Sequence, residues 1–182
     1  MLDRGALRDQ GTLHTARLRL EPLGDKHFPE VWASLADRES RRLTGTHAEF
    51  TEDAVRRHLA RVAGNEDRSD WAILDATDGR YLGEVVLNDL DPDNASMNYR
   101  IALSGGYGRG VGTEATRAVV AHGFDVIGLH RISLGVYAFN PRAIRVYEKC
   151  GFRREGVARD ALHWDGAWHG QITMAILTTD PR

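Results

Sequence analysis

A cluster of glycines near the middle of the chain constrains the fold more than any other feature of the sequence. Residues 104–112 contain five glycines, and they stand between a strand-like run and a helix-like run. Glycine lets the backbone approach a ligand closely, and a helix N-terminus carries roughly half a positive charge. Successive N–H groups at such a place suit an anion, above all a polyphosphate. The segment therefore predicts a strand–loop–helix unit that binds a phosphorylated ligand.

The spacing of these glycines excludes the commonest nucleotide-binding motifs. The dinucleotide pattern Gly-x-Gly-x-x-Gly fails because its last position is Val111 when counted from Gly106, and Thr113 when counted from Gly108. The P-loop fails because no Gly-Lys-Ser/Thr follows, and the kinase loop requires the same spacing as the dinucleotide pattern. Taken alone, the segment is also compatible with a flexible connection.

The composition is that of one globular domain. The chain has 182 residues, 42% hydrophobic and 27% charged, a length at which a single domain buries a substantial core. We expect a domain over residues 13–180, preceded by a flexible arm at residues 1–12, which are polar and lack periodicity. The single cysteine, Cys150, argues against a disulfide scaffold. With no apolar run near the about 20 residues of a membrane span and no signal peptide, a cytoplasmic protein without membrane contact is expected.

Charge and histidine spacing argue against two further classes of protein. The net charge is −2, whereas a general nucleic-acid binder needs a basic face, so we expect no nucleic-acid partner. The eight histidines show no tight ligand spacing, and His163 and His169 only flank a turn. We therefore expect no metal site.

Hydrophobic periodicity predicts an α/β (α+β) fold with a mixed, mostly antiparallel sheet of about six to seven strands and helices on both faces. Helices are expected after Asp25 and Thr51, from Thr113 to Ile127, and from Asn140 to Gly151. The strand-like runs are 15–20, 71–76, 81–87, 96–103, 131–136, 152–157 and 171–177.

Three segments of the chain resemble the Gcn5-related N-acetyltransferase (GNAT) family. They are TARLRLEPL at 15–23, YRIALSGGYGRGVGTEA at 99–115 and LHRISLGVYAFNPRAIRVYEKCGFRREG at 129–156. The last is the most specific, because Asn140 and the run Tyr147–Phe152 recur at this spacing in the family. Together with the hairpin at Trp164–Trp168, they resemble the ribosomal-protein alanine acetyltransferase-like branch. The resemblance covers nearly the whole chain and implies a central pair of strands that splay apart.

The resemblance implies acetyl-CoA as the co-substrate and assigns residues to it. The pantetheine arm would lie beside the strand residues before the loop, and Asn140 resembles an asparagine that contacts the cofactor. Arg142 and Lys149, like Arg145, are within reach of CoA phosphates but equally typical of solvated charges. The positions implied for the pantetheine arm and the pyrophosphate are Ile101, Ala102, Leu103, Gly108, Arg109, Gly110, Val111, Gly112 and Thr113.

The resemblance also implies how the reaction is catalysed. Tyr147 resembles the tyrosine near the thioester sulfur, and a phenol can donate a proton to the leaving thiolate. Strand N–H groups near Ala102 can stabilise the carbonyl oxygen. Relatives often carry a glutamate base where this chain has Ser96, so Glu84 and Asp89 are the substitutes. Each of these two is equally an ordinary charged position.

Several alternatives stay open from sequence alone. Trp32, Trp164 and Trp168 either line an acceptor pocket or pack in the core and the hairpin. The leading function is an N-acetyltransferase acting on a primary amine in a ternary complex. Candidate acceptors are a protein N-terminal amine, an amino sugar or antibiotic, a polyamine and an aminoacyl-nucleotide. The alternatives are a catalytically silent acyl-CoA-binding or regulatory module and a nucleotide-binding protein. Dimerisation, common in the family, makes a homodimer a further expectation.

Overall fold

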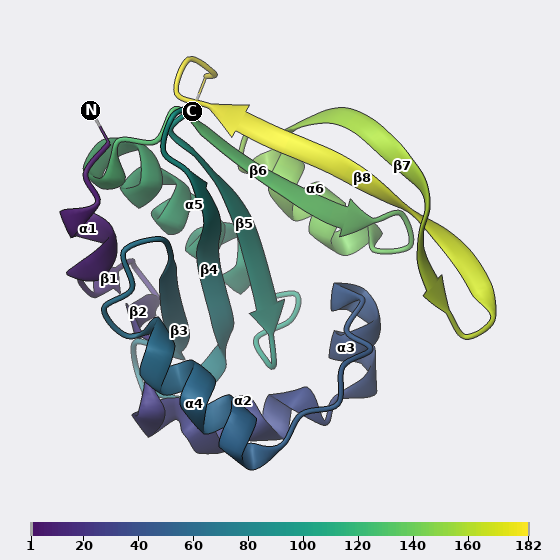
Figure 1. The fold of residues 1–182 in the computed structure, drawn as a ribbon, viewed down its shortest axis with the longest axis horizontal. Coiled ribbons are helices and arrows are strands. Elements are labelled where there is room, and N and C mark those ends of the chain that lie inside the picture. Colours follow the sequence, from purple (N-terminus) through teal and green to yellow (C-terminus); the bar gives the residue numbers. More distant parts are fainter. Residues whose placement is uncertain (1, 182) are drawn as a thin grey trace.

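The computed structural model describes residues 2–181 as one eight-stranded sheet flanked by helices (Figure 1). The strands lie in the order β1-β2-β3-β4-β5-β6-β8-β7, and every neighbouring pair is antiparallel except β5 and β6. Their bounds are β1 Leu13–His14, β2 Leu18–Pro22, β3 Ser69–Asp75, β4 Tyr81–Asp91, β5 Ser96–Leu103, β6 Arg131–Tyr137, β7 Arg153–Trp164 and β8 Ala167–Leu177. The predicted mixed sheet is therefore confirmed, with one strand more than expected.

Helices cover both faces of the sheet, as the periodicity predicted. The helices are α1 Gly5–Arg8, α2 Phe28–Leu35, α3 Arg38–Thr44, α4 Glu52–Val62, α5 Val111–His122 and α6 Pro141–Lys149, with a 3₁₀ turn at Asp25–His27 and a π-helical turn at Gly123–Ile127. Thr51 starts α4 as expected, because its hydroxyl accepts a hydrogen bond from Ala54 N at 3.3 Å. None of the helices among residues 2–181 has the length and apolar character needed to cross a membrane.

The core is divided between the two faces of the sheet. On one face, Trp71, Leu87 and Ile132 pack with residues of α5 and α6. On the other face, residues of α2 and α4 pack over Ala72 and Leu74 of β3. Because side chains alternate along a strand, the two faces of each central strand serve different cores. Polar residues on a strand face that no helix covers are thus free to line a site.

The splayed strands lie at the centre of the sheet. β5 and β6 pair in parallel over only three positions, from Ser96 opposite Arg131 to Asn98 opposite Ser133. Beyond Asn98, β5 continues to pair with β4 as far as Leu103, while β6 remains paired with β8 on its other edge as far as Tyr137. The two strands therefore diverge, and backbone groups of β5 that would face β6 are left without a strand partner.

Three short elements were not expected from the sequence. Residues 1–12 were expected to form a flexible arm, but, of those that the structure describes, Gly5–Arg8 forms α1 and Leu7 is only 1% exposed. Trp71 Nε1 also donates a hydrogen bond to Gly11 O at 3.0 Å. Residue 1 lies outside the described residues. The missed elements are too short for a periodicity to show, because α1 has four residues, β1 two and α3 seven.

Candidate functional site

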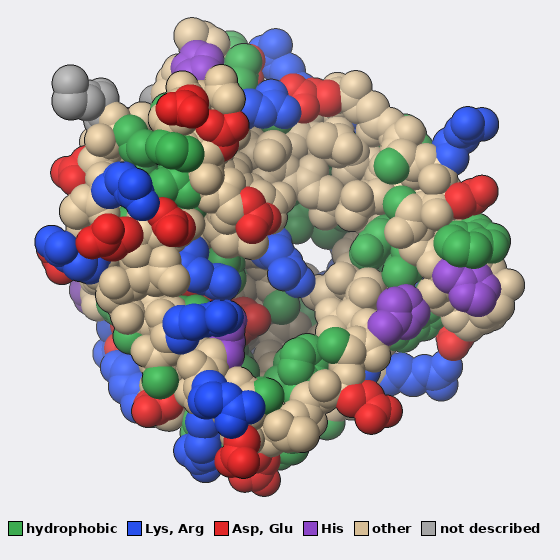
Figure 2. Space-filling model, in the orientation of Figure 1, with side chains coloured by type: hydrophobic (Ala, Val, Ile, Leu, Met, Phe, Trp, Pro, Cys, Tyr) green, Lys and Arg blue, Asp and Glu red, His purple; other side chains and the backbone are tan. Residues whose placement is uncertain are grey.

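A cleft of about 780 Å³ opens where β5 and β6 separate. Its walls come from β5, the glycine loop with the start of α5, α6, β6 and α3. Figure 2 shows the molecule hollowed at this place, with Lys and Arg side chains at the edge and an acidic side chain inside. The cleft thus runs from the glycine loop, through the gap between the strands, to α3.

The glycine loop is shaped to hold an anion. Gly106, Gly108 and Gly110 all have positive φ, between 68° and 83°, a conformation that other residues rarely adopt. Gly110 is the N-cap of α5, and the N–H groups of Val111, Gly112 and Thr113 have no acceptor among the described residues. These donors open on the cleft at the positive end of the helix dipole, which is the arrangement that favours phosphate.

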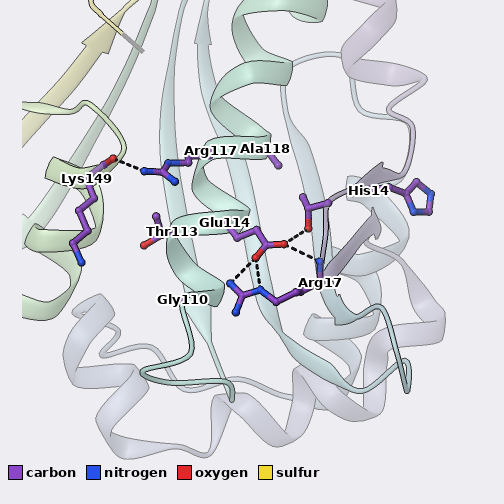
Figure 3. A pocket seen from close by; sticks show the side chains of 9 residues that line it. His14, Arg17, Gly110, Thr113, Glu114, Arg117, Ala118 and Lys149 are labelled. Carbon is purple, nitrogen blue, oxygen red and sulfur yellow. Dashed lines mark hydrogen bonds and ion pairs between the residues drawn. The ribbon is translucent and has the colours of Figure 1, made fainter.

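A charged clamp holds this loop against the rest of the sheet (Figure 3). The Arg17 guanidinium lies 2.6 Å from the Glu114 carboxylate and also donates to Arg109 O at 2.6 Å. Glu114 accepts further hydrogen bonds from Thr15 Oγ1 at 2.6 Å and Arg17 N at 2.9 Å. Burial tends to raise the pKa of Glu114, but the hydrogen bonds from Thr15 and Arg17 outweigh it and hold this pKa below its ordinary value. The carboxylate therefore ties the first turn of α5 to the segment before β2.

Glu114→Gln is expected to loosen this clamp. The loss of charge-assisted hydrogen bonds should cost about 1–3 kcal/mol, which corresponds to a fall in Tm of roughly 2–4 °C per kcal/mol for a domain of this size. Because the pKa of Glu114 is lowered in the folded protein, the wild-type advantage is present at neutral pH and disappears as pH falls through that pKa. Thermal unfolding of both proteins at several pH values tests this. Equal Tm values at neutral pH would contradict it.

Most of the residues assigned to the cofactor from the sequence do meet in the cleft. Arg109 is the exception, because it is not part of the lining, and its backbone is hydrogen-bonded to Arg17 and Gly106 instead. Asn140 is also the N-cap of α6, where its Oδ1 accepts from Ala143 N at 3.1 Å. The assigned residues that line the cleft are Ile101, Ala102, Leu103, Gly108, Gly110, Val111, Gly112, Thr113, Asn140, Arg142 and Lys149.

Tyr147 lies in the same cleft, on the wall formed by α6. Its ring packs edge-on against Tyr99 at 6.1 Å and is tilted against Phe152 at 5.9 Å, so its position is fixed by the core. The side chain is 7% exposed, and burial raises its pKa well above that of a free tyrosine. The phenol therefore stays protonated at neutral pH and is available as a hydrogen-bond donor.

Glu84 lies on β4 directly opposite Ala102 of β5. Its diagonal neighbours on that face are Asp70 of β3 and Arg100 of β5, because Val86 pairs with both. Burial raises the pKa of Glu84, and the negative charge of Asp70 adds to this, whereas Arg100 and Arg68 act against it. The carboxyl group is outside the cleft lining itself but opposite Ala102, which is part of that lining, and it is more basic than a solvated glutamate.

The structure does not bring the remaining candidates to the cleft. Ser96 lies at the closed end of the splay, paired with Arg131, six positions before Ala102, or roughly 20 Å along the strand. Trp32 stacks on Phe28 in the α2 core, 6.2 Å away. Trp164 packs on His47 and Trp168 on His163, at 4.8 Å each. The tryptophans therefore pack in the core and the hairpin, and Asp89 is likewise outside the cleft lining.

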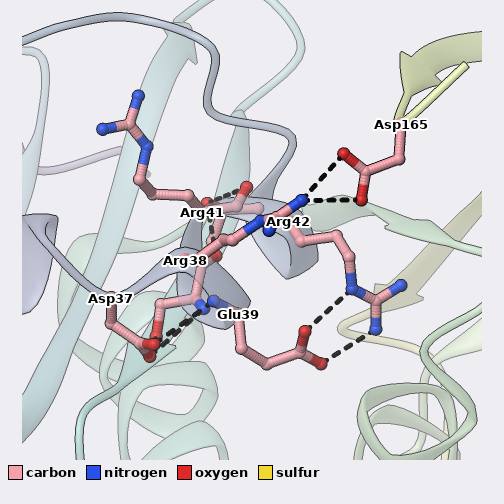
Figure 4. Close-up of polar contacts among 8 residues, drawn as sticks. Asp37, Arg38, Glu39, Arg41, Arg42 and Asp165 are labelled. Atoms are coloured by element: carbon pink, nitrogen blue, oxygen red, sulfur yellow. Dashed lines mark hydrogen bonds and ion pairs between the residues drawn. The ribbon is translucent and has the colours of Figure 1, made fainter.

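Helix α3, which was not predicted from the sequence, contributes a further wall of the cleft. Asp37 caps the helix by accepting from Glu39 N and Ser40 N, both at 3.2 Å. Figure 4 shows Arg38 paired with Asp165 of the β7–β8 turn at 3.0 Å, and Arg42 paired with Glu39 at 2.8 Å. The helix is therefore attached to the hairpin and presents side chains to the cleft.

The surface between α3 and the strands contains polar and aromatic residues that were not predicted from the sequence. Tyr137 and Phe139 stack at 5.6 Å, and the Arg42 guanidinium lies 4.5 Å from the Phe139 ring centre. The side-chain amide of Gln171 of β8 packs against Gly135 so closely that a Cβ atom added to Gly135 would lie 2.7 Å from it. Arg100 lines the same surface. The alternation on β5, with Met97 and Tyr99 buried and Asn98 and Arg100 on the other face, was the available signal.

Over residues 2–181, no group of three or more His, Cys, Asp or Glu side chains could hold a metal ion. The comparison with known families decides what kind of domain this cleft belongs to. A family model described as the acetyltransferase (GNAT) domain matches residues 17–153. The chain belongs to the GNAT acetyltransferase family. Solved structures agree: this GNAT chain has a TM-score of 0.85 to the spermidine N-acetyltransferase of Vibrio cholerae in complex with CoA and spermine. That match, at 20% identity, covers 91% of this chain and 98% of the other and confirms the fold.

Curated relatives are similar over part of their length. The "Probable N-acetyltransferase YjcK" of Bacillus subtilis is 35% identical over 118 residues, 63% of this GNAT chain and 65% of the relative. The spermidine N(1)-acetyltransferase of Escherichia coli K12 is 30% identical over 111 residues, 60% of each. The matched segments thus span less than two thirds of these relatives. They do not single out the ribosomal-protein branch that the sequence suggested.

Proposed function

We propose that the protein is an acetyl-CoA-dependent N-acetyltransferase that transfers an acetyl group to a primary amine in a ternary complex. The observation that carries this proposal is that one cleft contains both an anion site and a buried tyrosine. The unpaired N–H groups at the start of α5 provide a pyrophosphate site, and Tyr147 lies farther along the same cleft. Membership of the GNAT family supports the same chemistry.

Acetyl-CoA fits the cleft as a substrate with its pyrophosphate on the loop and its pantetheine arm between β5 and β6. The N–H groups of Val111, Gly112 and Thr113 would bind the pyrophosphate, and Arg142 and Lys149 are within the same lining. The backbone of Ile101–Leu103, which has no strand partner on the β6 side, would pair with the amides of the pantetheine arm. This places the thioester near Ala102.

The transfer step then needs a neutral amine, an oxyanion donor and a proton for the leaving group. The amine nitrogen attacks the thioester carbonyl, a C–N bond forms, and the C–S bond breaks as the electron pair moves to sulfur. A β5 N–H near Ala102 would stabilise the carbonyl oxygen as it gains charge. Tyr147, which is protonated at neutral pH, would give its proton to the leaving thiolate.

Glu84 is the proposed general base. It would take the proton from the ammonium form of the acceptor, through one water, because it lies opposite Ala102 and beside the cleft lining. Its raised pKa makes it a stronger base than an exposed carboxylate. After the C–N bond forms, the nitrogen loses its second proton, which reprotonates Tyr147 through water, and the proton collected by Glu84 is released to solvent, so the protons balance.

We propose a small molecule as the acceptor. The name of the Escherichia coli relative, a spermidine acetyltransferase, supports a small amine. The protein N-terminal amine typical of the ribosomal-protein branch is the second candidate, supported by the resemblance of the closing hairpin. The two candidate acceptors are distinguished by offering the same enzyme small free amines and peptides with a free N-terminus and measuring which are acetylated.

Calorimetric titration with acetyl-CoA tests the binding step, and release of free CoA thiol across a panel of amines tests the reaction. We expect one bound acetyl-CoA per chain and thiol release that requires an amine. Absence of acetyl-CoA binding would overturn the proposal. Binding without turnover on any amine or peptide would instead indicate a silent acyl-CoA-binding module.

A further inference from the structure

The acceptor half of the cleft, which we define as the part lined by Asn98, Arg100, α3 and Gln171, contains few negative charges for an enzyme acting on amines. Of the described residues that line the cleft, Glu39 is the one carboxylate, and it is paired with Arg42 through two hydrogen bonds of 2.8 Å. The other charged residues of the lining are Arg100, Arg142, Arg145 and Lys149. Of these, Arg142 and Lys149 lie on the side proposed for the pyrophosphate. A polycation on the acceptor side would therefore meet the neutralised Glu39–Arg42 pair and Arg100, with Glu84 as a further carboxyl group beside the lining.

Arg100 is the cation on the β5 wall of the cleft. It has no hydrogen-bonded or ion-paired partner among residues 2–181, although Glu84 is its diagonal neighbour on the sheet. Its side chain is exposed and lines the cleft. Arg142, by contrast, lies over the Tyr107 ring, 5.2 Å from its centre, beside the glycine loop. A guanidinium directed into a cleft without a partner is a ready site for a carboxylate or phosphate.

The position of Arg100 along β5 relates it to the reacting atoms. It is two residues beyond Asn98, where pairing with β6 stops, and two residues before Ala102. Two residues on a strand span about 7 Å, so an anion held by Arg100 would lie within a few bonds of an amine at the thioester. Asn98 and Gln171 add amide groups to the same lining.

We propose that the acceptor is a small amine that carries an anionic group, a carboxylate or a phosphate, a few bonds from its nitrogen, and that Arg100 binds this group. The proposal rests on the acetyltransferase function proposed above and names its substrate class. An anionic group also compensates the positive charge of Arg100, which would otherwise repel the ammonium form of the acceptor. Long polyamines, which lack such a group, are excluded as preferred acceptors.

Matched pairs of amines test the substrate class. Amino acids are compared with their amides, glucosamine 6-phosphate with glucosamine, and spermidine serves as the polycation. Rates of thiol release are expressed per concentration of unprotonated amine, so that differences in amine basicity cancel. At least one anionic amine is expected to exceed its neutral counterpart about tenfold or more in kcat/KM, and the better anion, carboxylate or phosphate, identifies the source.

Variants of Arg100 test the residue. Arg100→Gln is expected to raise KM for the preferred anionic amine about 10–100-fold, with the Kd of acetyl-CoA and the kcat on its pH plateau changed less than about threefold. The plateau is used because loss of Arg100 also raises the pKa of Glu84. Arg100→Lys should recover part of the loss, because it keeps the charge but not the bidentate geometry. Arg57→Gln, an exposed arginine on α4 outside the cleft lining, is the matched control and should behave as wild type.

Two results would overturn the proposal while leaving the acetyltransferase function intact. One is acetylation of neutral amines or spermidine as efficiently as of every anionic amine. The other is an equal effect of Arg100→Gln on both members of a matched pair. Failure of acetyl-CoA to bind the wild-type protein, seen by calorimetry before any amine is added, would instead contradict the proposed function itself.

Discussion

Glu84→Gln is expected to lower kcat/KM for the amine by about 10²–10⁴-fold at neutral pH, the range of a lost general base. Glutamine keeps the size of the side chain and its position opposite Ala102, but it cannot accept a proton. The Kd of acetyl-CoA should not change, because Glu84 is outside the cleft lining. Steady-state thiol release together with calorimetry separates the two effects.

The pH profile gives a second measure of the same variant. Burial raises the pKa of Glu84, so wild-type kcat/KM should fall, as pH is lowered, at a higher pH than an ordinary glutamate would give. With rates expressed per concentration of unprotonated amine, so that ionisation of the acceptor does not contribute, Glu84→Gln should lack this acid limb. Stability depends on pH in the opposite direction to activity. Because the pKa of Glu84 is raised in the folded protein, this group stabilises the fold at pH values below its ordinary pKa, and that stabilisation is lost as pH rises through the raised pKa. The variant should therefore be no less stable than wild type at neutral pH.

Asp89→Asn is the matched control, since Asp89 was the other carboxylate suggested by the sequence. Asp89 lies on the same strand with a φ of 55° and accepts from Asn88 Nδ2 at 3.0 Å, and asparagine tolerates such a φ. The activity and pH profile of the Asp89→Asn variant should match those of wild type. An acid limb that persists in Glu84→Gln, or that disappears in Asp89→Asn, would remove Glu84 from the role of base.

Local sequence features predicted the parts of the site that come from one continuous segment. The run from Tyr99 to Ala115 contains a strand, the loop and the first turn of a helix, so the spacing of its glycines already implies an anion site. The cap at Asn140 and the buried ring of Tyr147 follow in the same way from helix periodicity. Each of these signals depends on residues within about ten positions of one another.

The rest of the site depends on register and on contacts between distant segments. Ser96 was a candidate because it stands where relatives often carry a glutamate base, but only the register shows that it lies at the closed end of the splay. Glu84 gains its neighbours Asp70 and Arg100 from pairing across three strands. α3 is held by Arg38–Asp165, residues 127 positions apart. No single-sequence pattern encodes these relations, and so the acceptor surface could not be predicted.

Tyr147→Phe is expected to reduce kcat about 10–10³-fold, with little change in the KM of acetyl-CoA. The variant removes the donor proposed for the leaving thiolate and leaves the packing of the ring on Tyr99 and Phe152 in place. Since burial raises the pKa of Tyr147 far above neutrality, wild-type activity should show no alkaline fall from this group below about pH 10. Stopped-flow thiol release with saturating amine measures the chemical step directly.

Tyr99→Phe is the control that separates chemistry from packing. The Tyr99 hydroxyl is hydrogen-bonded to Thr116 Oγ1 at 2.7 Å inside the core, so its loss should cost about 1 kcal/mol of stability and little activity. Tyr147→Phe should show the reverse, because its hydroxyl has no hydrogen-bond partner among the described residues and its removal leaves no buried group unsatisfied. If Tyr147→Phe keeps the wild-type kcat, the thiolate must take its proton from water in the cleft, and Tyr147 is then a wall of the site and not its acid.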